Sequence, residues 1–214
     1  TKVDFSGSKH FVEIDNGKHI VSADSVIIAT GASAKWLGLE NEIRLRNLGG
    51  GVSACAVCDG FFYRNQEVAI VGAGDTAAEE ATYLAKLCKK VYMIVRSDKM
   101  RASKAMQHRV METPNIEVLW NSTTEDILGK DGVEGAIFKN TATGESRTVA
   151  ITGFFVAIGH QPNSDIFKGW LNMDEAGYIL TVPGSSRTNI EGVFAAGDVQ
   201  DKTYRQAVTA AGSG

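Results

Sequence analysis

Residues 67–77 read Glu67-Val-Ala-Ile-Val-Gly-Ala-Gly-Asp-Thr-Ala77. The first five residues form a short apolar run that is typical of a buried strand. The glycine-rich turn after it matches the pattern G-x-G-x-x-A, and residues 75–88 are rich in good helix formers. A strand, a glycine turn and a helix in this order are typical of dinucleotide-binding folds. This stretch therefore predicts a nucleotide-binding α/β domain.

The rest of the chain alternates between predicted strands and helices. Apolar runs at 24–29, 91–95, 154–158 and 193–196 predict further buried strands, and residues 101–112 predict a second helix. Strands that alternate with helices favour an α/β fold with a mainly parallel sheet.

Some segments depart from this pattern. Residues 11–21 predict a hairpin, because an Asp-Asn-Gly turn separates two short strands. Short strands near 116–120, 133–139 and 146–150, with turn residues between them, predict a small antiparallel layer. Residues 33–51 have no strong period and are expected to be linker and loop.

Composition argues against several classes of protein. The 214 residues carry 22 basic and 25 acidic side chains without a basic block, so nucleic acid is not an expected partner. No apolar run approaches the roughly 20 residues that span a bilayer, so no membrane association is expected, and no signal peptide is visible. Three cysteines are too few, and odd in number, for a secreted disulfide scaffold, which favours a cytoplasmic protein.

Two of the cysteines form the segment Cys55-Ala-Val-Cys58, which Asp59 follows directly. A zinc site would need a second ligand pair, and the remaining Cys88 and the scattered histidines have no such spacing, so no metal is expected. An inert thiol pair is the other alternative. We favour a redox-active pair, because CxxC spacing lowers the pKa of one thiol, and Asp59 is placed to protonate a departing thiolate. Cys88 is expected to be a packed or idle thiol.

The glycine turn supplies candidate nucleotide-binding residues. Gly72 permits the tight turn, Gly74 lets a pyrophosphate approach the backbone, and Ala77 keeps the helix close to the strand. The helix N-terminus, with Asp75 and Thr76, would meet the phosphates.

The residues after the following strand indicate which nucleotide is bound. An acid there suits the ribose of NAD, whereas an arginine suits the 2′-phosphate of NADP. Arg96 and Arg101 would bracket such a phosphate with charge-assisted hydrogen bonds. The alternative is two solvated surface arginines, and the nearby Asp98 weakens the phosphate interpretation.

An internal repeat predicts that part of the protein is missing. Residues 26–31 and 155–159 are both apolar strands that end at a glycine, and both look like the closing strand of a dinucleotide-binding unit. The second unit has its opening glycine loop at 72–74, but the first has none, which implies a deficit on the order of 60–80 upstream residues. Residues 210–214 look like a helix that is cut short. We therefore expect truncation at both ends, the alternative being a chance similarity of two strands.

Several segments of the chain resemble bacterial low-molecular-weight thioredoxin reductase, in the same order and over essentially the whole chain. They are Cys55–Gln66, Gly72–Ala81, Phe155–Asn163, Gly192–Val199 and Tyr204–Ala207. The resemblance implies a homodimeric flavoenzyme that uses FAD and NADPH. Its activity would be that of an NADPH-dependent flavin disulfide oxidoreductase whose protein partner is thioredoxin.

The resemblance also implies roles for the redox pair. Cys58 would face the flavin and form the charge-transfer thiolate, Cys55 would attack the disulfide of thioredoxin, and Asp59 would be the general acid. NADPH would pass a hydride to FAD, reduced flavin would open the disulfide, and Cys55 would reduce thioredoxin through a mixed disulfide. Phe61 and Phe62 either help to dock thioredoxin or pack in the protein.

The resemblance implies two nested dinucleotide-binding (FAD/NAD(P)-binding) domains. Residues 1–36 and 163–214 would form the FAD-binding domain, around an NADPH-binding domain at 37–162 that carries the disulfide. Hinges are expected around 33–38 and 160–166. The implied FAD-binding residues are Ala29, Thr30, Gly31, Gly197, Asp198, Arg205, Gln206 and Ala207. For Asp198, a helix N-cap is the alternative role.

Two departures from the resemblance matter. The family pattern His-Arg-Arg-x-x-x-Arg is Val95-Arg-Ser-x-x-x-Arg101 here, so a weaker preference for NADPH is expected. The first glycine loop of the family is absent, so the chain is expected to bind FAD poorly. Two alternative functions remain: the flavoprotein subunit that reduces an alkyl hydroperoxide peroxidase, and a non-catalytic nucleotide-binding fragment.

Overall fold

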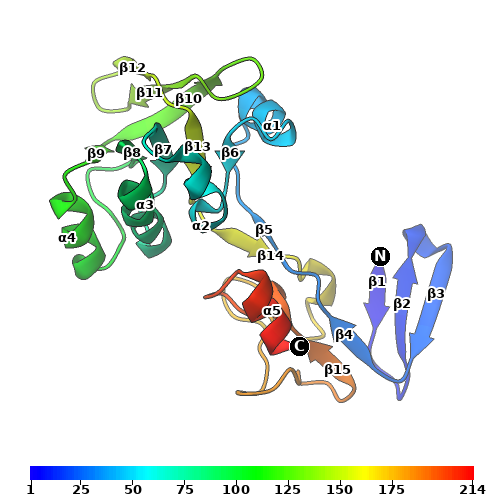
Figure 1. The fold of residues 1–214 in the computed structure, drawn as a ribbon. Helices are drawn as coiled ribbons and strands as arrows, with labels where there is room; N and C mark the ends of the chain where they lie inside the picture. Colours follow the sequence, from blue (N-terminus) through cyan, green and yellow to red (C-terminus); the bar gives the residue numbers. More distant parts are fainter. The chain divides into compact units, whose positions relative to one another are not determined.

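A computed structural model describes residues 1–214. The chain divides into two compact units, one of residues 1–33 with 160–214 and one of residues 34–159 (Figure 1). The chain passes from one unit to the other at β5 (Ala32–Ala34) and β14 (His160–Pro162), which pair with each other. None of the helices combines the length and the apolar character that crossing a membrane requires.

The unit of residues 34–159 is built on a five-stranded parallel sheet with the order β6-β13-β7-β8-β9. The strands are β6 (Val52–Ser53), β7 (Glu67–Val71), β8 (Lys90–Ile94), β9 (Ile116–Leu119) and β13 (Gly153–Val156). The predicted α/β fold with a parallel sheet is confirmed. Because the strands are parallel, their carboxyl ends meet at one edge, where ligands bind in such folds.

Helices cover one face of this sheet (Figure 1): α2 (Ala56–Asp59), α3 (Asp75–Leu87) and α4 (Lys104–Glu112). Ala77, Ala81 and Leu84 of α3 are fully buried against alternate strand residues such as Phe155. The small alanines let the helix lie close to the sheet. The neighbouring Phe154 points to the opposite face, as the two-residue period of a strand requires.

An antiparallel sheet packs on the opposite face, and its strands are β10 (Ser122–Leu128), β11 (Gly135–Asn140) and β12 (Ser146–Val149). The predicted antiparallel layer is therefore confirmed for β11 and β12. It is wrong for residues 116–120, because Ile116–Leu119 pairs in parallel with Val91–Ile94. Strand β10 was not predicted, since most of its residues are polar.

Residues 40–47 correct another expectation, because they form α1 (Glu40–Asn47) where a loop was predicted. Fully buried Glu42 accepts hydrogen bonds from the N–H groups of Leu37 and Gly38 at 3.0 and 2.7 Å. Arg44 donates to the carbonyls of Gly129 and Lys130. These contacts with other segments stabilise a helix whose own sequence is too polar to reveal it.

The unit of residues 1–33 and 160–214 contains an antiparallel sheet and a parallel strand pair. The sheet consists of β1 (Lys2–Asp4), β2 (His10–Ile14) and β3 (His19–Ala23), and the predicted hairpin is confirmed. Strand β4 (Val26–Ile28) pairs in parallel with β15 (Val193–Ala195). Beyond β15 lie a short 3₁₀ turn, η4 (Gly197–Val199), and α5 (Ala207–Ser213). The core of this unit contains Phe5, Ile28, Phe167, Leu171, Ile179 and Val193.

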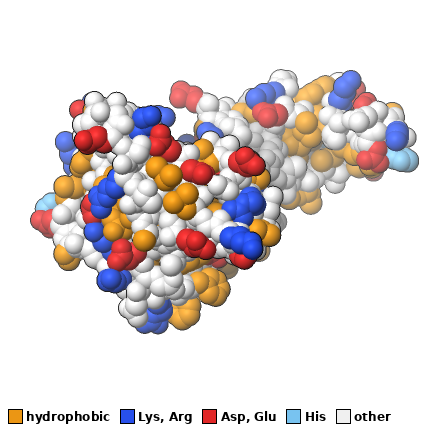
Figure 2. Space-filling model, turned by 90° about the horizontal axis from the view of Figure 1, so that it is seen from above, with side chains coloured by type: hydrophobic (Ala, Val, Ile, Leu, Met, Phe, Trp, Pro, Cys, Tyr) orange, Lys and Arg blue, Asp and Glu red, His pale blue; other side chains and the backbone are white.

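The surface has no block of one charge on the face drawn in Figure 2, where basic and acidic side chains are interspersed. The net charge of −3 is the difference between 22 basic and 25 acidic side chains.

Candidate redox and dinucleotide-binding sites

Cys55 and Cys58 form a disulfide in the unit of residues 34–159. Strand β6 ends at Ser53 and α2 begins at Ala56, so the disulfide lies where an edge strand turns into a helix. The Ser53 hydroxyl accepts the Cys55 N–H at 3.0 Å, and the Cys55 Sγ accepts the Cys58 N–H at 3.2 Å. The backbone donor aimed at Cys55 Sγ would also stabilise a thiolate there.

The surroundings of the disulfide are apolar and open to solvent. Cys58 is exposed, and Val57, Phe61 and Phe62 are 55%, 60% and 72% exposed. Neither phenylalanine is packed in the core of its unit. Tyr63 packs edge-to-face against Phe155. Burial raises the pKa of its phenol, and the charge of Asp59 is a second cause.

A cleft of about 860 Å³ opens at the carboxyl edge of the parallel sheet of the same unit. Its volume is within the range of ligand-binding pockets. Gly72, Gly74, Thr76 and Ala77 line it, together with residues 157–159 after β13. The structure therefore brings the predicted glycine turn to the edge where nucleotides bind in α/β sheets. Neither cysteine of the disulfide lines this cleft.

The two glycines of the turn differ in what surrounds them. A Cβ at Gly72 would collide with the Ala157 carbonyl oxygen and would lie 2.6 Å from the Ala77 Cβ, at a φ of +152°. A Cβ at Gly74 would meet nothing within 4 Å. Gly72 is thus required for close packing of strand and helix, whereas Gly74 leaves open space over the backbone at the start of α3.

Three cations line one side of the cleft: Arg96, Lys99 and Arg101. No ion pair involves any of them in the structure. Lys99 was not predicted, although it lies between the two predicted arginines. Asp98 is exposed and does not line the cleft. Three cations that line the cleft and form no ion pair make a site for a dianionic group such as a phosphate.

Asp75 does not line the cleft, although it was predicted as a cofactor-binding residue. Its carboxylate accepts the backbone N–H of Ser103 at 2.8 Å, and this bond lowers its pKa. Ser103 in turn caps α4. In the structure Asp75 therefore joins the starts of α3 and α4.

In the other unit, the predicted FAD-binding residues follow two adjacent parallel strands. Ala29, Thr30 and Gly31 come after β4, and Gly197 and Asp198 come after β15. The Ala196 N–H donates to the Ile28 carbonyl at 3.0 Å, which holds the two ends together. The Oδ1 atom of Asp198 is buried and has no hydrogen-bond partner. An orphaned carboxylate oxygen at the carboxyl end of parallel strands fits a ligand with hydroxyl groups.

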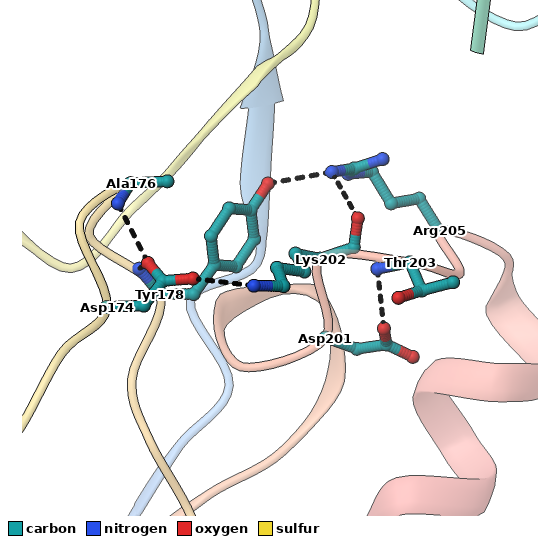
Figure 3. A network of polar contacts seen from close by, with 7 residues as sticks. All are labelled: Asp174, Ala176, Tyr178, Asp201, Lys202, Thr203 and Arg205. Atoms are coloured by element: carbon teal, nitrogen blue, oxygen red, sulfur yellow. Dashed lines mark hydrogen bonds and ion pairs between the residues drawn. The ribbon is translucent and has the colours of Figure 1, made fainter. Parts of the chain in front are cut away.

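A polar network holds Arg205, the first residue of the third predicted FAD segment, residues 205–207 (Figure 3). Arg205 donates to the Tyr178 hydroxyl at 2.8 Å and to the Lys202 carbonyl at 2.7 Å. Asp174 accepts bonds from the Tyr178 N–H, the Lys202 ammonium and the Ala176 N–H. Burial opposes ionisation of Asp174, but these bonds outweigh it and lower its pKa. Gln206 is the N-cap of α5 and Ala207 is its first residue, and both are exposed.

Comparison with known proteins agrees with this geometry. Residues 1–214 match the family described as pyridine nucleotide-disulphide oxidoreductase. The chain belongs to this family.

Relatives of this pyridine nucleotide-disulphide oxidoreductase are named thioredoxin reductase. The chain is 53% identical over 206 residues to that of Dictyostelium discoideum, covering 95% of the chain and 64% of the relative. It is 48% identical over 212 residues to that of Streptomyces clavuligerus, covering 99% and 65%. Among solved structures, thioredoxin reductase from Giardia duodenalis is 44% identical with a TM-score of 0.89, over 99% of this chain and 69% of that one. The chain thus spans less than two thirds of the length of these curated relatives.

Sequence reasoning missed some residues of the site in this pyridine nucleotide-disulphide oxidoreductase. Leu37, Leu39 and residues 122–124 line the cleft, yet they come from segments without a nucleotide-binding motif. Glu80 of α3 was missed as well. Its carboxylate lies near the backbone of Ala56, inside the CxxC segment. Cys88 was interpreted correctly, since it is a buried free thiol whose pKa burial raises to about 11.

Proposed function

We propose that this chain is a thioredoxin reductase, which passes electrons from NADPH through FAD and the Cys55–Cys58 disulfide to thioredoxin. The observation that carries the proposal is the disulfide itself, between α2 and an edge strand of the unit that also holds a dinucleotide cleft. A CxxC disulfide beside such a cleft suits two-electron transfer to another disulfide. The printed names of the most similar relatives support the same assignment.

We propose that the unit of residues 34–159 binds NADPH. Gly74 leaves room for the pyrophosphate over the N-terminus of α3, and Thr76 lies beside it. Arg96 and Arg101, with Lys99 between them, supply positive charge for the 2′-phosphate. Lys99 offsets part of the charge that the expected family pattern has lost, so a substantial preference for NADPH over NADH is proposed.

We propose that the unit of residues 1–33 and 160–214 holds part of an FAD site, which binds FAD weakly in this chain because the first glycine loop of the family is absent from it. The buried, unpartnered Asp198 Oδ1 would accept a hydrogen bond from a cofactor hydroxyl. Residues 29–31 would form the adjacent wall, and Thr30 and Asn163 are joined there by hydrogen bonds of 2.6 and 2.8 Å. Arg205, Gln206 and Ala207 would approach from the start of α5. The flavin, when bound, supplies the two-electron chemistry that connects a nicotinamide with a disulfide.

The chain's own residues account for the exchange with thioredoxin. In the reduced enzyme, the Cys55 thiolate attacks one sulfur of the thioredoxin disulfide and the other sulfur leaves as a thiolate, which Asp59 protonates. The Cys58 thiolate then attacks Cys55 of the mixed disulfide, which re-forms the Cys55–Cys58 bond and releases reduced thioredoxin. We propose that Val57, Phe61 and Phe62, which are exposed around the disulfide, form the docking surface for thioredoxin.

A relative movement of the two units forms part of the proposal. The disulfide does not line the nicotinamide cleft, although both belong to the same unit. The unit of residues 1–33 and 160–214, which would hold FAD, would therefore have to approach the cleft and the disulfide in turn. The chain passes between the units only at 33/34 and 159/160. We accordingly propose hinges around 33–38 and 160–166.

Two further proposals concern the oligomeric state of the protein and its location in the cell. Phe11 and Ile20 lie on one face of the β1–β3 sheet and are 42% and 68% exposed, which supports a homodimer that covers them. The low, odd number of cysteines, with Cys88 buried and outside any disulfide, supports a cytoplasmic protein. Light scattering on the purified protein tests the first point, and cell fractionation tests the second.

A coupled assay tests the proposed function. NADPH oxidation by the FAD-loaded protein is followed with thioredoxin or with a hydroperoxide-reducing peroxidase as the acceptor. We expect turnover with thioredoxin that Cys55→Ser and Cys58→Ser abolish, and that the matched control Cys88→Ser retains. Turnover with the peroxidase alone would favour the peroxidase-reductase alternative. Reduction of neither protein would overturn the proposal.

A further inference from the structure

Glu80 is a half-buried acidic side chain near the disulfide helix α2, and the proposed mechanism does not use it. It belongs to α3, which packs directly against the disulfide helix α2 (Figure 1). Its carboxylate makes a hydrogen-bonding contact with the backbone N–H of Ala56, the residue after Cys55. Its Oε2 atom is buried and has no hydrogen-bond partner. An ionised carboxylate with an oxygen that is buried and unpartnered is costly, so the site favours a protonated carboxyl.

The electrostatic surroundings agree with this geometry. Burial raises the pKa of Glu80 to about 7, the Ala56 N–H opposes this effect, and the charge of Glu79 adds to it. The carboxyl group therefore changes its charge near neutral pH, where a glutamate in water would be fully ionised.

The other titratable groups of the neighbouring elements do not neutralise Glu80. Asp59 of α2 is acidic, and its charge acts on Tyr63 of the 3₁₀ turn that follows. On α4, His108 pairs with Glu112, while Lys104 and Arg109 are exposed. Exposed Glu79 lies on α3 itself. No cation forms an ion pair with Glu80.

We propose that Glu80 is a positioning residue for the disulfide helix and that it takes up a proton when Cys55–Cys58 is reduced. The inference rests on the proposed function, in which this pair cycles between disulfide and dithiol. Reduction breaks the S–S bond with two electrons. It leaves two thiols if two protons are taken up, or a thiol and a thiolate if one is. A thiolate near an ionised Glu80 places a second negative charge close to a carboxylate whose Oε2 atom is shielded from water, and protonation of Glu80 removes one of the two charges.

The consequence is a pH-dependent equilibrium between disulfide and dithiol. Well below pH 7, Glu80 is already protonated and has no charge to act on the sulfurs. Above pH 7, its ionised form opposes the thiolate, so the disulfide is harder to reduce than it would be beside a neutral group. Glu80→Gln provides that neutral group, and its amide oxygen still accepts the Ala56 N–H. We expect the equilibrium constant for reduction of the disulfide to be the same in the two proteins at pH 6. At pH 8.5 this constant should be about tenfold larger in the variant, which corresponds to a reduction potential about 30 mV higher for the two-electron couple.

Equilibration with dithiothreitol tests this expectation. The reductant supplies two electrons and two protons, closes its own ring disulfide, and opens Cys55–Cys58. Flavin-loaded protein is equilibrated at a series of reduced-to-oxidised dithiothreitol ratios between pH 6 and 8.5. The samples are then quenched in acid, unfolded and alkylated for thiol counting by mass spectrometry. Cys88 contributes one constant thiol to each count, and flavin absorbance records the state of the cofactor separately.

Matched variants separate charge from structure. Glu79→Gln removes an exposed charge one residue away and should shift the equilibrium by less than threefold at any pH. Glu80→Asp keeps the charge on a shorter side chain and should retain the pH dependence. The decisive quantity is the equilibrium constant for reduction of Cys55–Cys58, compared between Glu80→Gln and the unmodified protein. If the ratio of the two constants is the same at pH 6 and pH 8.5, the proposal is overturned, because a purely structural contact has no such pH dependence. The measurement uses neither NADPH nor thioredoxin, so its outcome is independent of whether thioredoxin is the acceptor.

Discussion

Replacement of Gly72 by alanine tests the packing of strand and helix at the glycine turn. The new Cβ would collide with the Ala157 carbonyl and would lie 2.6 Å from the Ala77 Cβ, both of which belong to rigid backbone or buried core. Overpacking of this kind costs about 1–3 kcal/mol, and the positive φ adds about 1 kcal/mol. We therefore expect the free energy of unfolding to fall by about 2–4 kcal/mol. The corresponding decrease in Tm is roughly 5–15 °C.

The matched control is Gly74→Ala, two residues further along the same turn. Its Cβ would meet nothing within 4 Å, and the φ of −90° suits alanine. Alanine is a poorer N-cap than glycine, but it also restricts the unfolded chain, so the two effects offset each other and stability should change by about 0.5 kcal/mol or less. The same methyl group would occupy the space proposed for the pyrophosphate. It should therefore weaken NADPH binding at least about tenfold, or 1.4 kcal/mol. Thermal unfolding without nucleotide and isothermal titration calorimetry with NADPH measure the two effects. Equal Tm values for Gly72→Ala and the unmodified protein would refute the packing argument, and unchanged NADPH affinity of Gly74→Ala would refute the placement of the pyrophosphate.

Further predictions concern the cations, the spare thiol and an ion-pair cluster. Arg96→Ala and Arg101→Ala should each raise the Kd for NADPH about tenfold and leave that for NADH nearly unchanged; equal losses for both nucleotides would contradict a 2′-phosphate site. Because its pKa is about 11, Cys88 should be about 0.1% thiolate at pH 8 and should resist maleimide until the protein unfolds, as mass spectrometry would show. Bonds from Lys90, at 2.5 Å, and from Arg147 lower the pKa of Glu117 in the folded state, so its contribution to stability is present above about pH 4.5 and is lost as the pH falls through the folded pKa. Glu117→Gln should therefore reduce stability by about 0.5–1 kcal/mol at pH 7 and have no effect near pH 2 in urea unfolding; a loss of the same size at both pH values would contradict this.

Local patterns were sufficient for the central part of the fold. Residues 67–71 form a strand and residues 75–87 a helix, as their apolar run and helix formers predict. These signals are local because a buried strand and an amphipathic helix carry their period in consecutive residues. The α1 helix at 40–47 has no such period, since only Glu42 and Leu45 are buried. Its stability comes from contacts with residues distant along the chain, which a sequence window does not contain.

The parts of the candidate site that consist of neighbouring residues were also predictable from the sequence. The glycine turn and the CxxC segment are recognisable because their chemistry depends on fixed spacing between neighbours. The strand at 116–119 shows the opposite case. Its residues suit either sheet, and its parallel pairing with β8 depends on neighbours that are distant along the chain.

The sequence by itself determined the α/β class, the glycine turn, the redox pair and the family to which the chain belongs. Only the tertiary structure decided which charges surround them. Lys99 joins Arg96 and Arg101 at the cleft because the loop after β8 returns to the glycine turn, where the Arg101 N–H donates to the Ala73 carbonyl. Glu80 lies near Ala56 because α3 packs against α2, although 23 residues separate them in the chain. Electrostatic environment depends on distance through space and on burial, and neither is a property of adjacent residues.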